Sequence, residues 1–290
     1  MPEGASGAAP SPDRSGSAWL PLARGRRLAL DRPLVMGILN ATPDSFSDGG
    51  DLATEQAVQA RVRAMLAAGA ELLDVGGEST RPGHTTVAAD EELARILPVL
   101  RALRSVAPDA VVSVDTRKAS VARAALRAGA DLVNDVSGLS DPGMAGVVRE
   151  AGCALVLMRH ATIAGEVVAG CREQLRDLAA RAVQAGIPRS SLVVDPGLGF
   201  GEVPGGDVAA NLALLGGAAR YGDGLPVLVG ASRKRFLGTL TGIAVAKDRA
   251  LASAVAAVLA VQGGAAMVRV HDVAETMQAL RVAGLRAPPG

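Results

Sequence analysis

The sequence predicts an α/β fold, a single-domain (β/α)8 TIM barrel, and three observations support this prediction. Eight short apolar runs recur along the chain, helical stretches rich in Ala, Leu and Arg separate them, and polar residues and glycines gather at one end of the runs. Continuous apolar runs of this length are typical of parallel strands that are buried on both faces. Strands that alternate with helices, without a break between two domains, indicate a barrel.

We expect the eight strands at these apolar runs: 34–39, 71–76, 110–115, 131–135, 154–158, 191–195, 225–230 and 265–270. Stretches such as 55–70 and 172–187 have the periodicity of the helices between them. Several helical stretches end in a shared Ala-Gly pattern, for example A-A-G-A at 67–70, where a glycine closes the helix before the next strand. An open, doubly wound sheet is the alternative, but its glycine-rich fingerprint does not follow the first strand.

The composition of the chain argues against nucleic-acid and membrane partners. The 290-residue chain carries 30 Lys and Arg against 29 Asp and Glu, and only 2% of its residues are aromatic. We therefore expect no nucleic-acid partner, because such proteins are visibly basic or carry aromatic stacking platforms. No apolar run reaches the length of a membrane span, so no membrane partner is expected. Cys153 and Cys171 have neither zinc nor redox spacing, which is typical of apolar filler in a reducing cytoplasm.

The N-terminal segment differs in composition from the rest of the chain. Residues 1–27 are rich in Pro, Gly, Ser and Ala and lack the basic start and apolar stretch of a secretory signal. This composition predicts a disordered tail, and the alternative for Trp19 and Leu20 is that they dock onto the domain. The barrel domain is then expected to cover residues 28–290.

Two acidic residues stand where the active site of a barrel is expected, at the carboxyl ends of strands. Asp115 and Asp195 each end an apolar run. Helix capping is the alternative role, above all for Asp115, because a helix follows it. Two carboxylates that face a closed pocket suit a ligand with paired N–H donors, such as the guanidine-like edge of a heterocycle. Asn134 would extend this recognition, because its side chain both donates and accepts.

Basic residues follow other strands on the same rim. Lys234 and Arg233 lie in G-A-S-R-K-R, and Arg81, Arg269 and His271 add to them. A solvated helix start is the alternative for the first two, although the helix dipole disfavours cations there. Basic groups that converge on a barrel mouth suit an anionic substrate, with phosphate or pyrophosphate first among the choices. The P-loop motif of nucleotide sites does not occur.

Metal and covalent chemistry can be judged from the same residues. His84, His160 and His271 lack the usual zinc spacings. A Mg²⁺ ion that accompanies a pyrophosphate needs only one or two protein oxygens, and Asn40 is a candidate for one of them. The G-x-S-x-G nucleophile motif is absent, and neither cysteine follows a strand near a candidate base, so covalent catalysis is not indicated.

Seven motifs occur in order: M-G-I-L-N-A-T-P-D-S-F-S-D-G-G, D-V-G-G-E-S-T-R-P-G, S-V-D-T-R-K, N-D-V-S-G, D-P-G-L-G-F-G, L-V-G-A-S-R-K-R-F-L-G and R-V-H-D-V. With them the chain resembles the dihydropteroate synthases, the folate-pathway enzymes that sulfonamides target, over about residues 31–285. The resemblance implies a (β/α)8 barrel and a transferase that condenses 6-hydroxymethyl-7,8-dihydropterin diphosphate with p-aminobenzoate. The products would be 7,8-dihydropteroate and pyrophosphate.

The resemblance also implies roles for individual residues, motif by motif. The implied catalytic residues are Asp115, Asp195 and Lys234. The pterin diphosphate would contact these three together with Thr80, Asn134, Met158, Arg269 and His271. The p-aminobenzoate subsite would take Phe46, Asp48, Thr80, Arg81, Pro82 and Ser232. Mg²⁺ is the implied cofactor, held by Asn40 and the phosphates, and the usual dimeric state of the family implies a homodimer. The Ala-rich helix expected at 248–263 is a candidate interface, and an ordinary barrel-facing helix is the alternative.

The first motif divides into two parts under this resemblance. Asn40, at the end of the strand, would be rigid, whereas residues 42–50 would form a mobile lid that Phe46 and Asp48 order over p-aminobenzoate.

The chain departs from the family pattern around the fifth and sixth strands. Arg159 stands where L-M-H is usual, and Glu202 and Ala210 replace a Lys and a His that many members carry. We expect these changes to alter affinity or stability without removing the chemistry. A corrinoid-type pterin-binding methyltransferase and a catalytically inactive paralogue are the alternative functions. The first lacks S-R-K and comes with cobalamin partners, and the second typically loses S-T-R-P-G or S-R-K, both of which are intact here.

Overall fold

Eight parallel strands form the wall of a barrel, as expected. The computed structural model of the protein describes residues 18–41, 54–78, 86–163, 165–200 and 207–288. The wall runs in the order β8-β7-β6-β5-β4-β3-β10-β9. Its strands are β3 (Leu34–Asn40), β4 (Leu72–Gly76), β5 (Val111–Asp115), β6 (Leu132–Asp135), β7 (Leu155–Met158), β8 (Leu192–Asp195), β9 (Leu228–Val229) and β10 (Met267–Val270).

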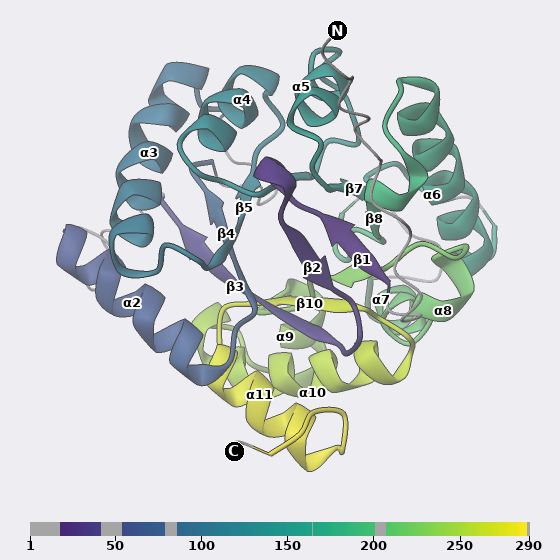
Figure 1. The fold of residues 1–290 in the computed structure, drawn as a ribbon. Coiled ribbons are helices and arrows are strands. Elements are labelled where there is room, and N and C mark those ends of the chain that lie inside the picture. Colours follow the sequence, from purple (N-terminus) through teal and green to yellow (C-terminus); the bar gives the residue numbers. More distant parts are fainter. Residues whose placement is uncertain (1–17, 42–53, 79–85, 164, 201–206, 289–290) are drawn as a thin grey trace, which may run out of the picture.

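Helices surround the wall on the outside (Figure 1). They are α2 (Glu55–Ala68), α3 (Ala89–Val106), α4 (Ala119–Arg127), α5 (Met144–Ala151), α6 (Val167–Gln184), α7 (Asp207–Leu215), α8 (Ala218–Tyr221), α9 (Arg235–Thr241), α10 (Ala250–Gln262) and α11 (Val273–Val282), with short 3-10 turns η1 (Ala23–Gly25), η2 (Arg189–Ser191) and η3 (Ala246–Arg249). Helix α2 ends as the Ala-Gly pattern predicts, because Gly69 adopts φ 107° and its N–H returns to the last turn. None of the described helices is long and apolar enough to cross a bilayer.

The barrel closes at its shortest strand. The run expected at 225–230 pairs as a strand only over β9, which joins β10. On its other side, a single bridge joins Val227 to Val194 of β8. Pro226 explains the short pairing, because it has no N–H to donate and takes part only through its carbonyl, which accepts from Val194 N at 3.0 Å.

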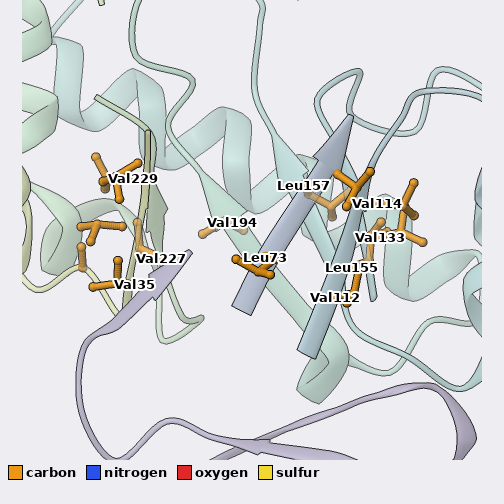
Figure 2. Close-up of a cluster of buried hydrophobic side chains, with 14 of the residues drawn as sticks. Val35, Leu73, Val112, Val114, Val133, Leu155, Leu157, Val194, Val227 and Val229 are labelled. Carbon is orange, nitrogen blue, oxygen red and sulfur yellow. The ribbon is translucent and has the colours of Figure 1, made fainter. Parts of the chain in front are cut away.

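Side-chain alternation along the strands separates two cores. Outward residues such as Val35, Leu73 and Val112 pack under the helices (Figure 2). Inward residues such as Leu34 and Leu72 instead fill the half of the barrel interior at which the strands begin, here called the lower half. The polar residues lie in the upper half, where the strands end. The apolar core of the lower half therefore supports a polar site in the upper half.

The expected tail boundary after residue 27 is wrong. Strand β1 (Trp19–Pro21) pairs antiparallel with β2 (Arg27–Ala29). This hairpin lies across the end of the barrel at which the strands begin (β1 and β2, in front of the centre of the barrel in Figure 1), and there Leu20 and Leu22 join the inner apolar core. Backbone bonds from Ala23 N to Asp131 O and from Ala154 N to Pro21 O dock it onto the wall.

Candidate active site

A polar layer crosses the upper end of the barrel interior. Strand pairing places Asn40 beside Gly76, Gly76 beside Asp115, and Asp115 beside Asn134. These residues continue the inward alternation of the apolar residues below them, and Asp115 and Asn134 are buried. Gly76 leaves room for its neighbour, because a Cβ there would lie 3.3 Å from the Cβ of Asp115. The expected strand-end residues therefore do meet in one layer.

Arg269 connects this layer across the barrel. Its Nε donates to Asp74 Oδ2 at 2.6 Å, and its Nη2 donates to Asp115 Oδ2 at 2.7 Å. Asn134 Nδ2 reaches the same Asp74 oxygen at 3.2 Å. The sequence prediction missed Asp74, which lies within a strand rather than at its end. The signal that was available is a carboxylate inside an apolar run, since an unpaired one is rarely buried there.

Three buried polar atoms in this layer and directly beneath it have no hydrogen-bond partner among the described residues. They are Asp74 Oδ1, Ser113 Oγ and Asn134 Oδ1, on the adjacent strands β4, β5 and β6. Buried polar groups are nearly always satisfied in folded proteins, and each exception requires an explanation. A polar ligand with several donors explains all three, because two of the atoms are acceptors and the hydroxyl can act in either role.

Burial raises the pKa values of two acidic residues of the site, Asp115 and Asp195. It raises the pKa of Asp115 to about 7, against the opposing pull of the Arg269 guanidinium, and the neighbouring Asp74 carboxylate adds to the rise. Burial also raises the pKa of Asp195, although the Gly197 N–H, at 2.7 Å from Oδ1, and the Lys234 ammonium act against it. Two carboxyls with raised pKa values in a barrel mouth are typical of a functional site.

Lys234 lies at the edge of the same layer. It precedes α9, and its ammonium lies 4.1 Å from the centroid of the Phe200 ring. Burial lowers its pKa to about 8, while Asp195 and Asp115 act in the opposite direction. Burial would also lower the pKa of Arg269, but Asp74 and Asp115 outweigh it and the net pKa is raised. The two cations therefore face two carboxyls.

The loop that carries Lys234 is held from below by a second arginine. Arg249 is buried, and its Nη1 donates to the carbonyls of Arg233 at 3.0 Å and Lys234 at 3.2 Å. Arg233 itself pairs with Asp272 through a two-point contact of 3.0 and 2.5 Å. Its charge is thus neutralised beside the site, contrary to the expectation that it adds free positive charge to the rim.

Ser232 and His271 form a pair. Ser232 Oγ lies 3.0 Å from His271 Nδ1 and accepts from the His271 backbone N–H at 3.1 Å. The family resemblance implies the p-aminobenzoate subsite for Ser232 and the diphosphate for His271, so the two expected subsites would adjoin at this contact.

The remaining predicted residues fall into two groups. Met158 is buried at the end of β7, where it pairs with Asp195. The others lie outside the described residues, as does the expected lid at 42–50: Phe46, Asp48, Thr80, Arg81 and Pro82.

Known proteins share this architecture. A family model described as "pterin binding enzyme" matches residues 36–271. The dihydropteroate synthase of Mycobacterium leprae (strain TN) is 46% identical over 268 residues, which cover 86% of this chain and 92% of the relative. A probable bifunctional folylpolyglutamate synthase/dihydropteroate synthase of Haloferax volcanii is 44% identical over 264 residues, covering 87% of this chain, but the chain spans only 30% of its length. The solved structure of Xanthomonas albilineans dihydropteroate synthase with 4-aminobenzoic acid superposes with a TM-score of 0.84 at 44% identity, covering 93% of this chain and all of the other.

Proposed function

Because the chain belongs to the family of pterin-binding enzymes, we propose that it is a transferase of folate biosynthesis that works as a dihydropteroate synthase. It would condense 6-hydroxymethyl-7,8-dihydropterin diphosphate with p-aminobenzoate to 7,8-dihydropteroate and pyrophosphate. The observation that carries the proposal is the group of unpartnered buried atoms on Asp74, Ser113 and Asn134, which lies beside the Asp115 carboxylate and its partner Arg269. A pterin ring offers paired N–H donors and ring acceptors, and this layer can satisfy them.

The reaction exchanges one bond for another at a single carbon. The bond from the exocyclic methylene to the diphosphate oxygen breaks, and a bond from that carbon to the amine nitrogen of p-aminobenzoate forms. Pyrophosphate leaves with the electron pair, and the amine loses a proton. An electron-rich dihydropterin can support positive charge at the methylene carbon, so the leaving group can depart before the amine attacks.

The residues of the layer would act mainly through charge and position. Asp115, as a carboxylate, would support the cationic methylene, and Asn134 would orient the ring. Lys234 and Arg269 would partly neutralise the negative charge of the diphosphate, and His271 would donate a hydrogen bond to a diphosphate oxygen. A buried site strengthens each of these interactions relative to water.

Mg²⁺ is the proposed cofactor, and Asn40 would be its ligand from the protein. Asn40 ends β3 and is half-buried on the inward side of the rim. No group of three or more His, Cys, Asp or Glu that could hold a metal ion occurs within the described part of the chain. A single amide oxygen fits an ion that keeps its other ligands from water and phosphate, as Mg²⁺ does. When bound, Mg²⁺ would neutralise the charge that grows on the departing pyrophosphate.

Replacement of Lys234 tests this assignment. Lys234→Ala should lower kcat/KM by at least about 100-fold while the far-ultraviolet circular dichroism stays unchanged, because a half-buried charge that would face the substrate is lost. Lys247→Ala is the matched control, since Lys247 is exposed on η3 and should leave turnover unchanged. Near-normal turnover of Lys234→Ala would show that the site is assigned wrongly.

A homodimer is also part of the proposal. Helix α10 exposes Leu251, Val255 and Leu259, with 77%, 50% and 42% of their surface accessible, at a spacing of four residues. Leu240 of α9 and Val245 before η3 extend the apolar surface, and both elements contact α10. An apolar stripe of this kind is typical of a subunit interface. Leu251→Glu with Val255→Glu should convert a dimer to a monomer in light scattering, whereas an unchanged mass would place the interface elsewhere.

A cytoplasmic location completes the proposal. Its support is that Cys153 and Cys171 are both buried free thiols, as a reducing compartment allows.

A further inference from the structure

Ser232 and His271 lie side by side because the two strands before them are paired. Val229 of β9 lies beside Val268 of β10, and the same register three residues further along each chain segment brings Ser232 beside His271. Ser232 is buried and His271 is half-buried. Their contact therefore joins the loop after β9 to the loop after β10, with little access for water.

The backbone of His271 is bound on both sides of its Cα atom. Its N–H donates to Ser232 Oγ at 3.1 Å, and its carbonyl accepts from Arg61 Nη2 of helix α2 at 2.9 Å. The next residue, Asp272, is held by Arg233. These bonds fix the backbone, so only the side-chain torsions of His271 can still change the direction of its ring.

The imidazole ring is bound by the same hydroxyl group. Ser232 Oγ lies 3.0 Å from His271 Nδ1. A serine hydroxyl has one proton to donate and two lone pairs with which to accept. Because a backbone N–H can only donate, the hydroxyl accepts the bond from His271 N, and its own proton remains available for Nδ1. Within the described part of the chain, Ser232 Oγ has no other acceptor at hydrogen-bond distance.

This arrangement favours one of the two tautomers of neutral His271. With the ring proton on Nε2, the hydroxyl donates to Nδ1, and the backbone N–H, the hydroxyl proton and Nδ1 all have partners. With the ring proton on Nδ1, the ring donates to Ser232 Oγ, and the described residues leave the hydroxyl proton without an acceptor. A buried donor without a partner is costly, because it has lost its bonds to water as well. The partner of one ring nitrogen thus decides what the other nitrogen can do.

We infer that Ser232 is a positioning residue for the diphosphate: it holds His271 in the tautomer that carries its proton on Nε2, so that this N–H is the donor to a diphosphate oxygen. The inference rests on the proposed function, in which His271 donates that hydrogen bond. With the proton on Nδ1, Nε2 would present a lone pair, which repels an anionic oxygen. This role of Ser232 acts through another residue and is separate from the p-aminobenzoate subsite that the family resemblance implies.

The first measurement is an NMR spectrum of the imidazole nitrogens in the full chain, labelled with 15N at histidine and free of substrates. The chain has three histidines, and the signals that are missing in His271→Ala belong to His271. At the alkaline end of a pH titration, where the signals no longer change, the wild type should show a protonated Nε2 and an unprotonated Nδ1. In Ser232→Ala the Nδ1 signal should shift, because the hydroxyl that donates to it is gone.

Ser253→Ala is the matched control. Ser253 is a buried serine of α10 whose hydroxyl accepts from Arg233 N at 2.9 Å and donates to Arg249 O at 2.7 Å. It therefore supports the same loop without a hydrogen bond to His271. This variant should leave the His271 signals in place. Equal shifts in Ser253→Ala and Ser232→Ala would report a general change of the loop and would contradict the inference.

The second measurement is the binding of pyrophosphate in the presence of Mg²⁺, by titration calorimetry. p-Aminobenzoate is left out, so a contact between Ser232 and that substrate cannot contribute. Ser232→Ala should weaken pyrophosphate binding by about 10-fold, about the effect of one misplaced hydrogen bond to a charged group. His271→Ala should weaken it at least as much. The double variant should bind pyrophosphate no more weakly than His271→Ala alone, because Ser232 acts only through the ring.

Three results would overturn the positioning role. They are a wild-type His271 that is protonated at Nδ1, unchanged pyrophosphate binding in Ser232→Ala, and effects of Ser232→Ala and His271→Ala that multiply in the double variant. The wild-type spectrum keeps the inference testable if Ser232→Ala does not fold. A wild-type protein that forms no dihydropteroate would instead refute the proposed function, so the two failures can be told apart.

Discussion

Asp115→Asn should stabilise the fold while it removes activity. The carboxyl is buried, and its pKa is raised from the ordinary 3.8 to about 7. A folded-state pKa above the unfolded value means that the favourable contribution is present below pH 3.8 and is lost as the pH rises through about 7. At pH 8 the folded protein therefore carries the cost of an ionised Asp115. Asparagine has nearly the same shape and no charge, so it avoids this cost.

The size of the effect follows from the pKa. The rise from 3.8 to about 7 corresponds to about 4 kcal/mol, at 1.36 kcal/mol for each pKa unit. This figure already includes the attraction of Arg269, which also keeps Asp74 as a partner in the variant. Protein relaxation reduces such values, so we expect a gain of about 2–4 kcal/mol in the free energy of unfolding at pH 8.

Urea unfolding followed by circular dichroism, at pH 8 and pH 5, measures this gain. The variant should be more stable at pH 8, and the difference should narrow at pH 5. Its kcat should fall by at least about 100-fold, because no carboxylate faces the cationic methylene. Asp223→Asn is the control, since Arg172 lowers the pKa of that carboxyl and its removal should bring no gain. An Asp115→Asn protein that is less stable than wild type at pH 8 would refute the reasoning.

Three further predictions follow from single contacts. Leu20→Ala should lower the free energy of unfolding by about 2–5 kcal/mol in urea without changing kcat, because Leu20 is buried in the inner core; a loss below about 1 kcal/mol would argue against that role. Gly197→Ala should lower both stability and kcat/KM, since the new Cβ meets the Arg159 carbonyl, and wild-type values would exclude this close approach. In the pH profile, kcat/KM should fall as the pH rises through about 8, where Lys234 loses its proton, and a limb that stays flat to pH 10 would show that this proton is not required.

The fold could be predicted because the strand signal is strong and repeated. Most strands of the wall lie in apolar runs, and such runs are typical of parallel strands buried on both faces. The hairpin at 18–30 was missed for the opposite reason. Its strands are three residues each beside a segment rich in Pro, Gly and Ser, and Leu20 is buried only because the open end of the barrel receives it. That contact is long-range and leaves no local pattern.

The positions of the candidate site residues could be predicted where those residues stand at strand ends. Asp115, Asn134 and Asp195 follow apolar runs, and parallel strands bring such positions to one rim. Asp74 was not predicted, because its role depends on Arg269, which reaches it from a strand 195 residues further along the chain. The sequence also does not show that the side chains of two adjacent residues contact different parts of the molecule.

Arg233 and Lys234 are such a pair of adjacent residues. They are adjacent in the chain, yet the first turns to Asp272 and the second to Phe200. Only the backbone of the loop, with Arg233 at φ 60°, decides which side chain faces the barrel.

Product formation by the wild-type protein tests the central claim most directly. The full chain would be incubated with 6-hydroxymethyl-7,8-dihydropterin diphosphate, p-aminobenzoate and Mg²⁺, and dihydropteroate and pyrophosphate would be measured together. We predict that the two products appear in equal amounts and that neither forms when p-aminobenzoate is left out at the same enzyme concentration. Tight binding of the pterin diphosphate without any dihydropteroate would contradict the claim and identify the protein as a pterin binder that lacks the transferase reaction.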